Sequence, residues 1–131
     1  MPNVNGILET ALDVDDPQRS ARFYQAIFGF EIIVTTERLI AMSVCEGQVL
    51  LLFKKGVSAS LPQSPHDGNG QLHLAFAISR SEMEQWLTWL PQHGIAIEED
   101  RAWERSGRSL YFRDPDQHLL EIATPGVWSN Y

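Results

Sequence analysis

The stretch QHLLEIATP, residues 117–125, places a carboxylate in the middle of a strand that is expected to be buried. Apolar residues typical of a core strand surround the acidic residue Glu121 on both sides: Leu119, Leu120, Ile122 and Ala123. Burying a carboxylate is costly unless a cation or a hydrogen-bond donor accompanies it. The partner of Glu121 is therefore the first question that this sequence poses.

Length and composition predict one domain. The chain has 131 residues, of which 44% are hydrophobic, and a chain of that size can form a single core. Its apolar stretches are shorter than the roughly 20 residues of a membrane span, so we expect no membrane association. The first ten residues lack the basic start and apolar run of a secretory signal. The single cysteine, Cys45, excludes an intrachain disulfide framework, and we expect a cytoplasmic location.

The charge pattern argues against nucleic acid as a partner. The formal net charge is −7, and the sequence has no block of lysine and arginine. Four arginines do gather late in the chain, and most of them are expected to lie on a solvated face: Arg101, Arg105, Arg108 and Arg113. One or two of them could steer an anionic small-molecule substrate.

Residues 6–54 predict the element order β-α-β-β-β. Alternating apolar residues at 6–14 indicate a strand, and Asp16-Pro17 supplies a helix cap followed by proline at the first helical position. Apolar residues then recur at helical spacing until Gly29. Three strand-like runs separated by short polar turns complete this module.

The same order is predicted again at residues 71–124. A strand at 71–79 precedes a helix, for which Ser81 and Glu84 form a candidate capping box and which Pro91 and Gly94 are expected to end. Three further strands follow. A polar segment rich in glycine, proline and serine, residues 55–70, links the two modules. The prediction is an α+β fold, one domain over 1–131, with two βαβββ modules forming a cleft between curved mixed sheets.

Aligning the two modules provides a candidate answer for Glu121. Glu9 on the first strand of one module matches His73 on the first strand of the other, and Leu51 matches Glu121 on the last strands. A pseudo-twofold relation would bring these four positions together. Carboxylate, imidazole and carboxylate form a plausible ligand set for a divalent cation. The alignment therefore predicts a metal site made of Glu9, His73 and Glu121.

Each of these residues also has a plainer explanation on its own. His73 alone would fit a hydrogen-bonded core histidine, Glu9 a solvent-facing strand edge, and Glu121 an ion pair with Arg113. The three matched positions together favour the metal. His118 lies three residues before Glu121, so we expect it on the opposite face of the strand and not among the ligands.

Three stretches resemble the vicinal oxygen chelate superfamily, which includes glyoxalase I, extradiol dioxygenases, fosfomycin-resistance thiol transferases and bleomycin-binding proteins. They are LDVDDPQRSARFYQAIFGFEI at 12–32, GQLHLAFAI at 70–78 and, most specifically, LYFRDPDQHLLEIATPG at 110–126. The resemblance covers nearly the whole chain. It implies a glyoxalase-like fold, a homodimer, and metal ligands at Glu9, His73 and Glu121.

This sequence differs from individual members of the family at the ligand positions, and these differences limit which of their activities it is expected to have. Extradiol dioxygenases have histidine at the place of Glu9, and glyoxalase I has a fourth ligand at the place of Leu51. Fosfomycin enzymes have three ligands, usually with histidine for Glu9, and a basic residue beyond the last strand, which residues 126–131 lack. The ligand set suits Mn, Zn, Ni, Mg or Fe(II).

The resemblance implies a metal-dependent lyase, isomerase or transferase that acts on a small oxygenated substrate. Glu121 or Glu9 would serve as the base, and Tyr111 would donate a hydrogen bond to a substrate oxygen; a core aromatic is the plainer explanation of Tyr111. Two alternatives belong to other classes. One is an extradiol-type dioxygenase, and the other is a metal-free protein that sequesters a small molecule, as bleomycin-binding relatives do.

Overall fold

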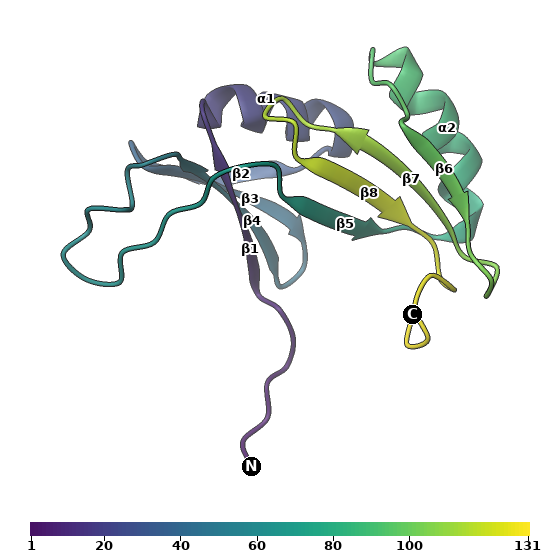
Figure 1. Ribbon diagram of the computed structural model, residues 1–131, viewed down its shortest axis with the longest axis horizontal. Helices are drawn as coiled ribbons and strands as arrows, with labels where there is room; N and C mark the ends of the chain where they lie inside the picture. Colours follow the sequence, from purple (N-terminus) through teal and green to yellow (C-terminus); the bar gives the residue numbers. More distant parts are fainter. The chain divides into compact units, whose positions relative to one another are not determined.

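The computed structural model describes residues 1–131 and divides into two compact units, Met1–Gly70 and Gln71–Tyr131 (Figure 1). Each unit contains one four-stranded sheet and one α-helix of ten or more residues. The α+β class and the repeated βαβββ order are thus confirmed. No helix has the length and apolar character needed to cross a membrane.

The first unit is built around a mixed sheet in the strand order β1-β4-β3-β2. Its first strand pairs in parallel with its last, and the other pairs are antiparallel. Asp16 caps the helix by accepting hydrogen bonds from two backbone N–H groups, and Gly29 ends it with a positive φ of 72°. The elements are β1 (Glu9–Val14), α1 (Pro17–Phe28), β2 (Glu31–Thr35), β3 (Leu39–Cys45) and β4 (Gln48–Lys54).

The second unit repeats this topology, with the strand order β5-β8-β7-β6 and a parallel pair between its first and last strands. A short 3-10 turn is added before its helix. The elements are β5 (His73–Ala77), η1 (Arg80–Glu82), α2 (Met83–Gln92), β6 (Glu99–Ala102), β7 (Arg108–Arg113) and β8 (Leu119–Ala123).

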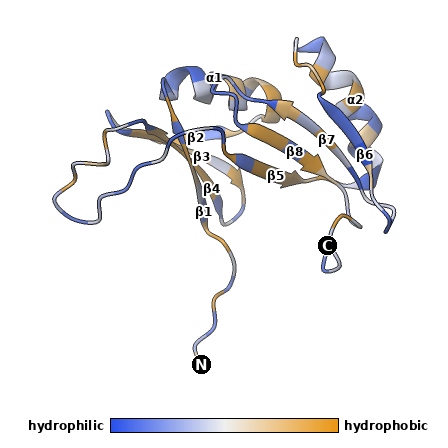
Figure 2. Ribbon diagram, viewed as in Figure 1, coloured by the Kyte–Doolittle hydropathy of each residue, from blue (hydrophilic) through white to orange (hydrophobic).

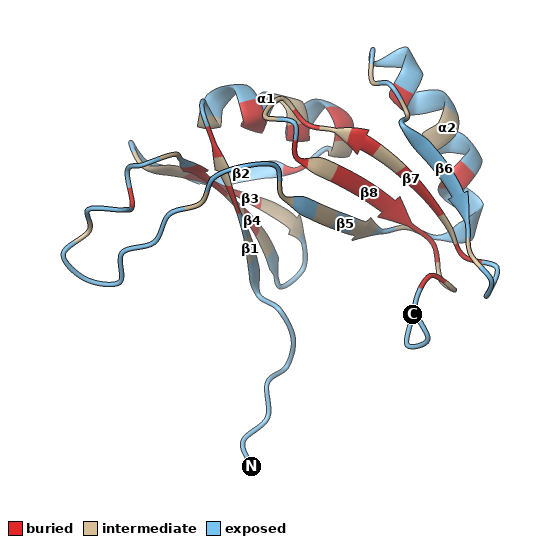
Figure 3. Cartoon of the chain, viewed as in Figure 1, coloured by how far each residue is buried: buried red, intermediate tan, exposed pale blue.

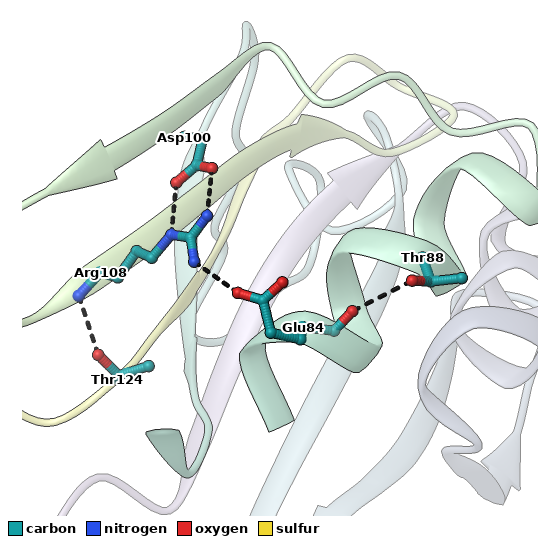
Figure 4. Close-up of polar contacts among 5 residues, drawn as sticks. All are labelled: Glu84, Thr88, Asp100, Arg108 and Thr124. Carbon is teal, nitrogen blue, oxygen red and sulfur yellow. Dashed lines mark hydrogen bonds and ion pairs between the residues drawn. The ribbon is translucent and has the colours of Figure 1, made fainter. Parts of the chain in front are cut away.

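The start of the second helix differs from the sequence-based expectation. The carboxylate that caps this region is Glu82, which accepts hydrogen bonds from the N–H and the hydroxyl of Ser79 at 3.0 and 2.6 Å. Glu84 instead accepts a hydrogen bond from the guanidinium of Arg108 at 2.8 Å (Figure 4). The helix ends at Gln92, between the two residues that were expected to end it: Pro91 lies within its last turn, and Gly94 follows with a positive φ of 73°.

The two sheets have the same register between their parallel strands. Glu9 pairs with Val49 in the first unit, and His73 pairs with Leu119 in the second. Two residues further along, Ala11 pairs with Leu51, and Ala75 pairs with Glu121. The alignment of the two modules therefore holds at the level of strand pairing, where Glu9 corresponds to His73 and Leu51 to Glu121.

Each unit buries its own apolar core, and most of the buried strand residues lie on β3, β4, β7 and β8 (Figures 2 and 3). In β4, Leu50 and Leu52 are almost completely buried, while Leu51 between them is only partly so. In the second unit the fully buried apolar side chains are Leu90, Leu110, Phe112, Leu120 and Ile122. The strand β8 differs from β4 because its intervening residue, Glu121, is buried as well.

The polar segment 55–70 contacts the first unit. Ser58 is buried, and its hydroxyl accepts a hydrogen bond from the guanidinium of Arg38 at 3.0 Å. The His66 ring lies edge-on to Phe53, with 4.6 Å between ring centroids. Segment 55–70 thus folds back onto the strands that precede it.

Candidate metal centre

Glu121 lies at the centre of one row of residues across the second sheet. Its paired neighbours are Ala75 on β5 and Tyr111 on β7, and paired residues project from the same face of a sheet. The Glu121 side chain is only 8% exposed. The sheet therefore holds a buried carboxylate between a small residue and a phenol.

The imidazole of His73 contacts the carboxylate of Glu121. The Nε2 atom of His73 lies 3.2 Å from Oε2 of Glu121, and half of the imidazole surface is exposed. Because His73 is two residues before Ala75 on β5, both residues face the same side of the sheet as Glu121. The structure thus brings together two of the three predicted ligands.

A backbone contact orients the His73 ring. Its Nδ1 atom lies 3.0 Å from the carbonyl oxygen of Leu119, which can only accept, so Nδ1 carries the proton. In the neutral ring this leaves a lone pair on Nε2, directed at the carboxylate of Glu121. Such a backbone acceptor is the usual means by which proteins orient a metal-binding histidine. Nitrogen and carboxylate oxygen in this arrangement fit a divalent metal ion.

The proposed ion pair between Glu121 and Arg113 is not formed. Arg113 donates to the carboxylate of Glu98 at 2.9 Å and to the carbonyl oxygen of Gln117 at 3.0 Å. Arg113 is therefore engaged with the strand edge and the turn before β8. Within the second unit, the neighbours of the Glu121 carboxylate are His73 and Tyr111.

Tyr111 is partly buried and contributes a polar group to this face. Burial is the main cause of the raised pKa of its phenol. The negative charge of Glu121 and a hydrogen bond between the phenol and Glu121 raise this pKa further. Hydrogen bonds with Ser109 and Arg101 act in the opposite direction. The phenol is therefore protonated at neutral pH and available as a donor. Whether Tyr111 donates to a substrate oxygen or serves as a core aromatic with a solvated hydroxyl stays a prediction.

One residue of this face, Ser109, was missed by the sequence-based interpretation, and Arg101 was named there only as one of four arginines that could steer an anionic substrate. Ser109 is fully buried, and its hydroxyl accepts a hydrogen bond from the indole N–H of Trp103 at 2.9 Å. The guanidinium of Arg101 lies over the Trp103 ring, 4.8 Å from its centroid. Ser109 could have been found by its spacing, because it lies two residues before Tyr111 on one strand and so shares its face.

Glu9 lies on β1 of the first unit, is exposed and pairs with Val49. Neither unit by itself brings together three histidine, cysteine, aspartate or glutamate side chains that could hold a metal ion. The second unit supplies two donors, His73 and Glu121, and the role of Glu9 as the third ligand stays a prediction.

Comparison with known proteins supports the same assignment of the fold. A metallothiol transferase FosB from Staphylococcus saprophyticus subsp. saprophyticus is 30% identical over 122 residues, which are 92% of this chain and 78% of that protein. A lactoylglutathione lyase from Agrobacterium tumefaciens has a crystal structure that matches with a TM-score of 0.90 at 29% identity, covering 98% of this chain and 99% of the other. The fosfomycin resistance protein FosX from Listeria monocytogenes matches with a TM-score of 0.72 at 21% identity, over 95% of this chain and 97% of the other, and shows the fold alone.

The similarity extends over both modules. Of the three proteins just described, the two that are more than 25% identical to this chain are named as enzymes, one a transferase and the other a lyase. The family match runs from residue 6 to residue 122 and so includes β1, where Glu9 lies, and β8, where Glu121 lies. The chain belongs to the Glyoxalase/Bleomycin resistance protein/Dioxygenase superfamily.

Proposed function

We propose that this protein is a metal-dependent transferase that joins a thiol to a small oxygenated substrate. The observation that carries the proposal is the His73–Glu121 pair, in which an oriented imidazole nitrogen and a buried carboxylate oxygen lie 3.2 Å apart. The transferase class is supported by the 30% identity to a metallothiol transferase over 92% of the chain. A set of three ligands without a fourth at Leu51 agrees with this class.

The proposed ligands are Glu9, His73 and Glu121, and the candidate ions are Mn, Zn, Ni, Mg and Fe(II). A divalent ion held there would supply Lewis-acid polarisation of substrate oxygens. The chain's own contribution is the orientation of the donors. The carbonyl of Leu119 fixes the His73 ring, and burial within the sheet restricts the carboxylate of Glu121.

Protein side chains beside the pair suit a substrate with an anionic or strongly polar oxygen. In the transfer, the sulfur of the thiolate would bond to an electrophilic carbon, a carbon–oxygen bond would break, and the freed oxygen would take up a proton. Tyr111 is placed to donate a hydrogen bond to such an oxygen. Arg101, held over Trp103, offers a positive charge on the same face of the sheet.

A lyase or isomerase is the second candidate, and the similarity to a lactoylglutathione lyase at a TM-score of 0.90 and 29% identity supports it. In that reaction Glu121 or Glu9 would accept a proton from a carbon next to a carbonyl group. Leu51 occupies the position at which a fourth ligand would be expected, so we rank this class second.

Two further possibilities have less support. An extradiol-type dioxygenase would have histidine in place of Glu9, and a metal-free sequestering protein would have no use for an oriented imidazole beside a buried carboxylate. A homodimer, a cytoplasmic location and the absence of a nucleic-acid partner stay predictions from the sequence.

Activity on a small set of substrates tests the proposal. The protein, loaded separately with each candidate ion, is assayed for thiol addition to epoxides, for rearrangement of thiol hemiacetals, and for oxygen consumption with catechols. We expect thiol addition that is lost in His73→Ala and Glu121→Gln. Turnover restricted to hemiacetals would establish the lyase instead, and oxygen uptake with Fe(II) would establish the dioxygenase.

A further inference from the structure

We propose that His118 is a positioning residue for the His73–Glu121 pair, and this inference rests on the proposed metal-dependent function. His118 lies on the turn that leads into β8 and is completely buried. Its ring acts on the pair through the backbone N–H of Leu72, one residue before His73 and the start of β5.

The contact that carries this inference joins the His118 ring to the backbone immediately before β5. The Nδ1 atom of His118 accepts a hydrogen bond from the N–H of Leu72 at 2.9 Å. Because a backbone N–H can only donate, Nδ1 must present its lone pair, and in the neutral ring the proton is on Nε2. An imidazole in this tautomer therefore ties the turn before β8 to the start of β5.

The turn itself holds His118 in place. One carboxylate oxygen of Asp114, Oδ1, accepts hydrogen bonds from the N–H groups of Asp116 and His118, each at 2.9 Å. The N–H of Asp114 donates to the carbonyl of His118 at 3.2 Å. Gln117 takes a positive φ of 66°, which lets the chain reverse within this turn. The imidazole position is thus set before β8 begins.

Two more hydrogen bonds complete a connection between β5 and β8. The N–H of Leu119 donates to the carbonyl of Leu72 at 2.8 Å, and the Nδ1–H of His73 donates to the carbonyl of Leu119 at 3.0 Å. Together with the His118–Leu72 bond they fix which residue of β5 stands beside which residue of β8. A register slip by one residue would turn His73 to the opposite face of the sheet, away from Glu121.

Matched variants separate the hydrogen bond from the packing. His118→Phe keeps a buried ring of similar size but has no acceptor for the Leu72 N–H. His118→Asn is smaller but retains an acceptor oxygen near the position of Nδ1. Leu72→Pro removes the donor while leaving His118 intact, and proline is tolerated just before the first residue of a strand.

Two measurements on full-length protein test the inference, both at a temperature where circular dichroism shows each variant to be folded. The first is long-range ¹H–¹⁵N NMR of the metal-free protein, which reports whether the His73 proton is on Nδ1. The second is titration with Co²⁺, followed by its visible absorption spectrum. A residue that only stabilised the fold would lower the melting temperature and leave both readouts unchanged in the folded protein.

We expect His118→Phe and Leu72→Pro to lose the Nδ1–H form of His73 and to weaken Co²⁺ binding about 10- to 100-fold, with an altered spectrum. His118→Asn should remain close to the unmodified protein in both readouts. Unchanged His73 signals and Co²⁺ affinity in folded His118→Phe or Leu72→Pro would overturn the inference.

A result that contradicts the proposed metal site can be distinguished from one that contradicts the role of His118. If the unmodified protein binds no Co²⁺, the proposed function fails, while the His73 tautomer in the metal-free variants still decides whether His118 positions that ring. His118→Phe removes the acceptor of this hydrogen bond and Leu72→Pro removes its donor. If one of these two variants does not fold, the other still tests the hydrogen bond against His118→Asn, which retains it.

Discussion

The Nε2 atom of His73 lies 3.2 Å from Oε2 of Glu121, while the other ring nitrogen of His73 donates to the carbonyl of Leu119. In a neutral ring this geometry directs a nitrogen lone pair at a buried carboxylate. Two electron-rich atoms at this distance are stabilised when a positively charged species binds both. The arrangement supports the assignment of these residues as two ligands of one cation.

Replacing Glu121 by glutamine should weaken divalent metal binding by about tenfold or more, because the neutral amide removes the negative charge and leaves the fold intact. Isothermal titration with Zn²⁺ measures the change. Glu104→Gln is the matched control, since it removes one carboxylate from an exposed turn of the same unit. Equal affinities in the two variants would remove Glu121 from the metal site.

Glu9→Gln tests the third ligand separately. If Glu9 completes the site, metal affinity should fall about tenfold or more, while the His73 ring signals of the metal-free protein stay unchanged because the His73 contacts lie within the second unit. Titration and NMR on the same sample give both results. An unchanged metal affinity would leave His73 and Glu121 as the only protein ligands among the three predicted.

Tyr111→Phe should lower kcat by about 100-fold and change metal affinity by less than about threefold, because the lost hydroxyl donates to a substrate oxygen in the transition state, while its hydrogen bond to Glu121 in the metal-free protein is replaced when a metal binds that carboxylate. Steady-state kinetics beside a metal titration make the comparison. A loss confined to metal affinity would mean that the hydroxyl serves Glu121 and not the substrate.

Stability at acid pH should depend on Asp100. The guanidinium of Arg108 donates two hydrogen bonds to Asp100, at 2.8 and 2.6 Å, and lowers the pKa of that carboxyl (Figure 4). A lowered pKa in the folded state contributes stability that is complete above the ordinary carboxyl pKa of about 3.9 and is lost as the pH falls through the folded-state value.

We therefore expect Asp100→Asn to reduce the free energy of unfolding by up to about 1 kcal/mol at pH 7, the size typical of partly exposed pairs. The difference between the variant and the unmodified protein should shrink as the pH falls below the ordinary carboxyl pKa of about 3.9, and it should disappear once Asp100 is protonated in the folded state. Urea unfolding between pH 2 and pH 7 measures it. A difference that persists unchanged at low pH would assign the effect to packing and not to the ion pair.

Much of the fold could be predicted because local signals and long-range packing agree. Asp16-Pro17 and Gly29 mark the helix ends that the structure shows, and the alternation of apolar residues locates the strands. The matched positions Glu9 and His73 were correct at the level of strand register, since each pairs with the equivalent residue of its last strand.

Other features depended on partners distant in sequence. The segment SRSEME, residues 79–84, contains two serine–glutamate pairs with capping-box spacing. The choice of Glu82 over Glu84 follows from Arg108, which is 24 residues away and binds Glu84. Arg101 belongs to the Tyr111 neighbourhood because β6 and β7 pair in one particular register, which no local pattern indicates.

The most direct test of the central claim is the metal content of the protein after equilibrium dialysis against a mixture of divalent ions, measured by mass spectrometry. It is compared with that of a His73→Ala/Glu121→Gln double variant whose folding is verified by circular dichroism. We expect about one metal ion per chain in the unmodified protein and almost none in the variant. Equal metal content in the two proteins would contradict the assignment of His73 and Glu121 as ligands.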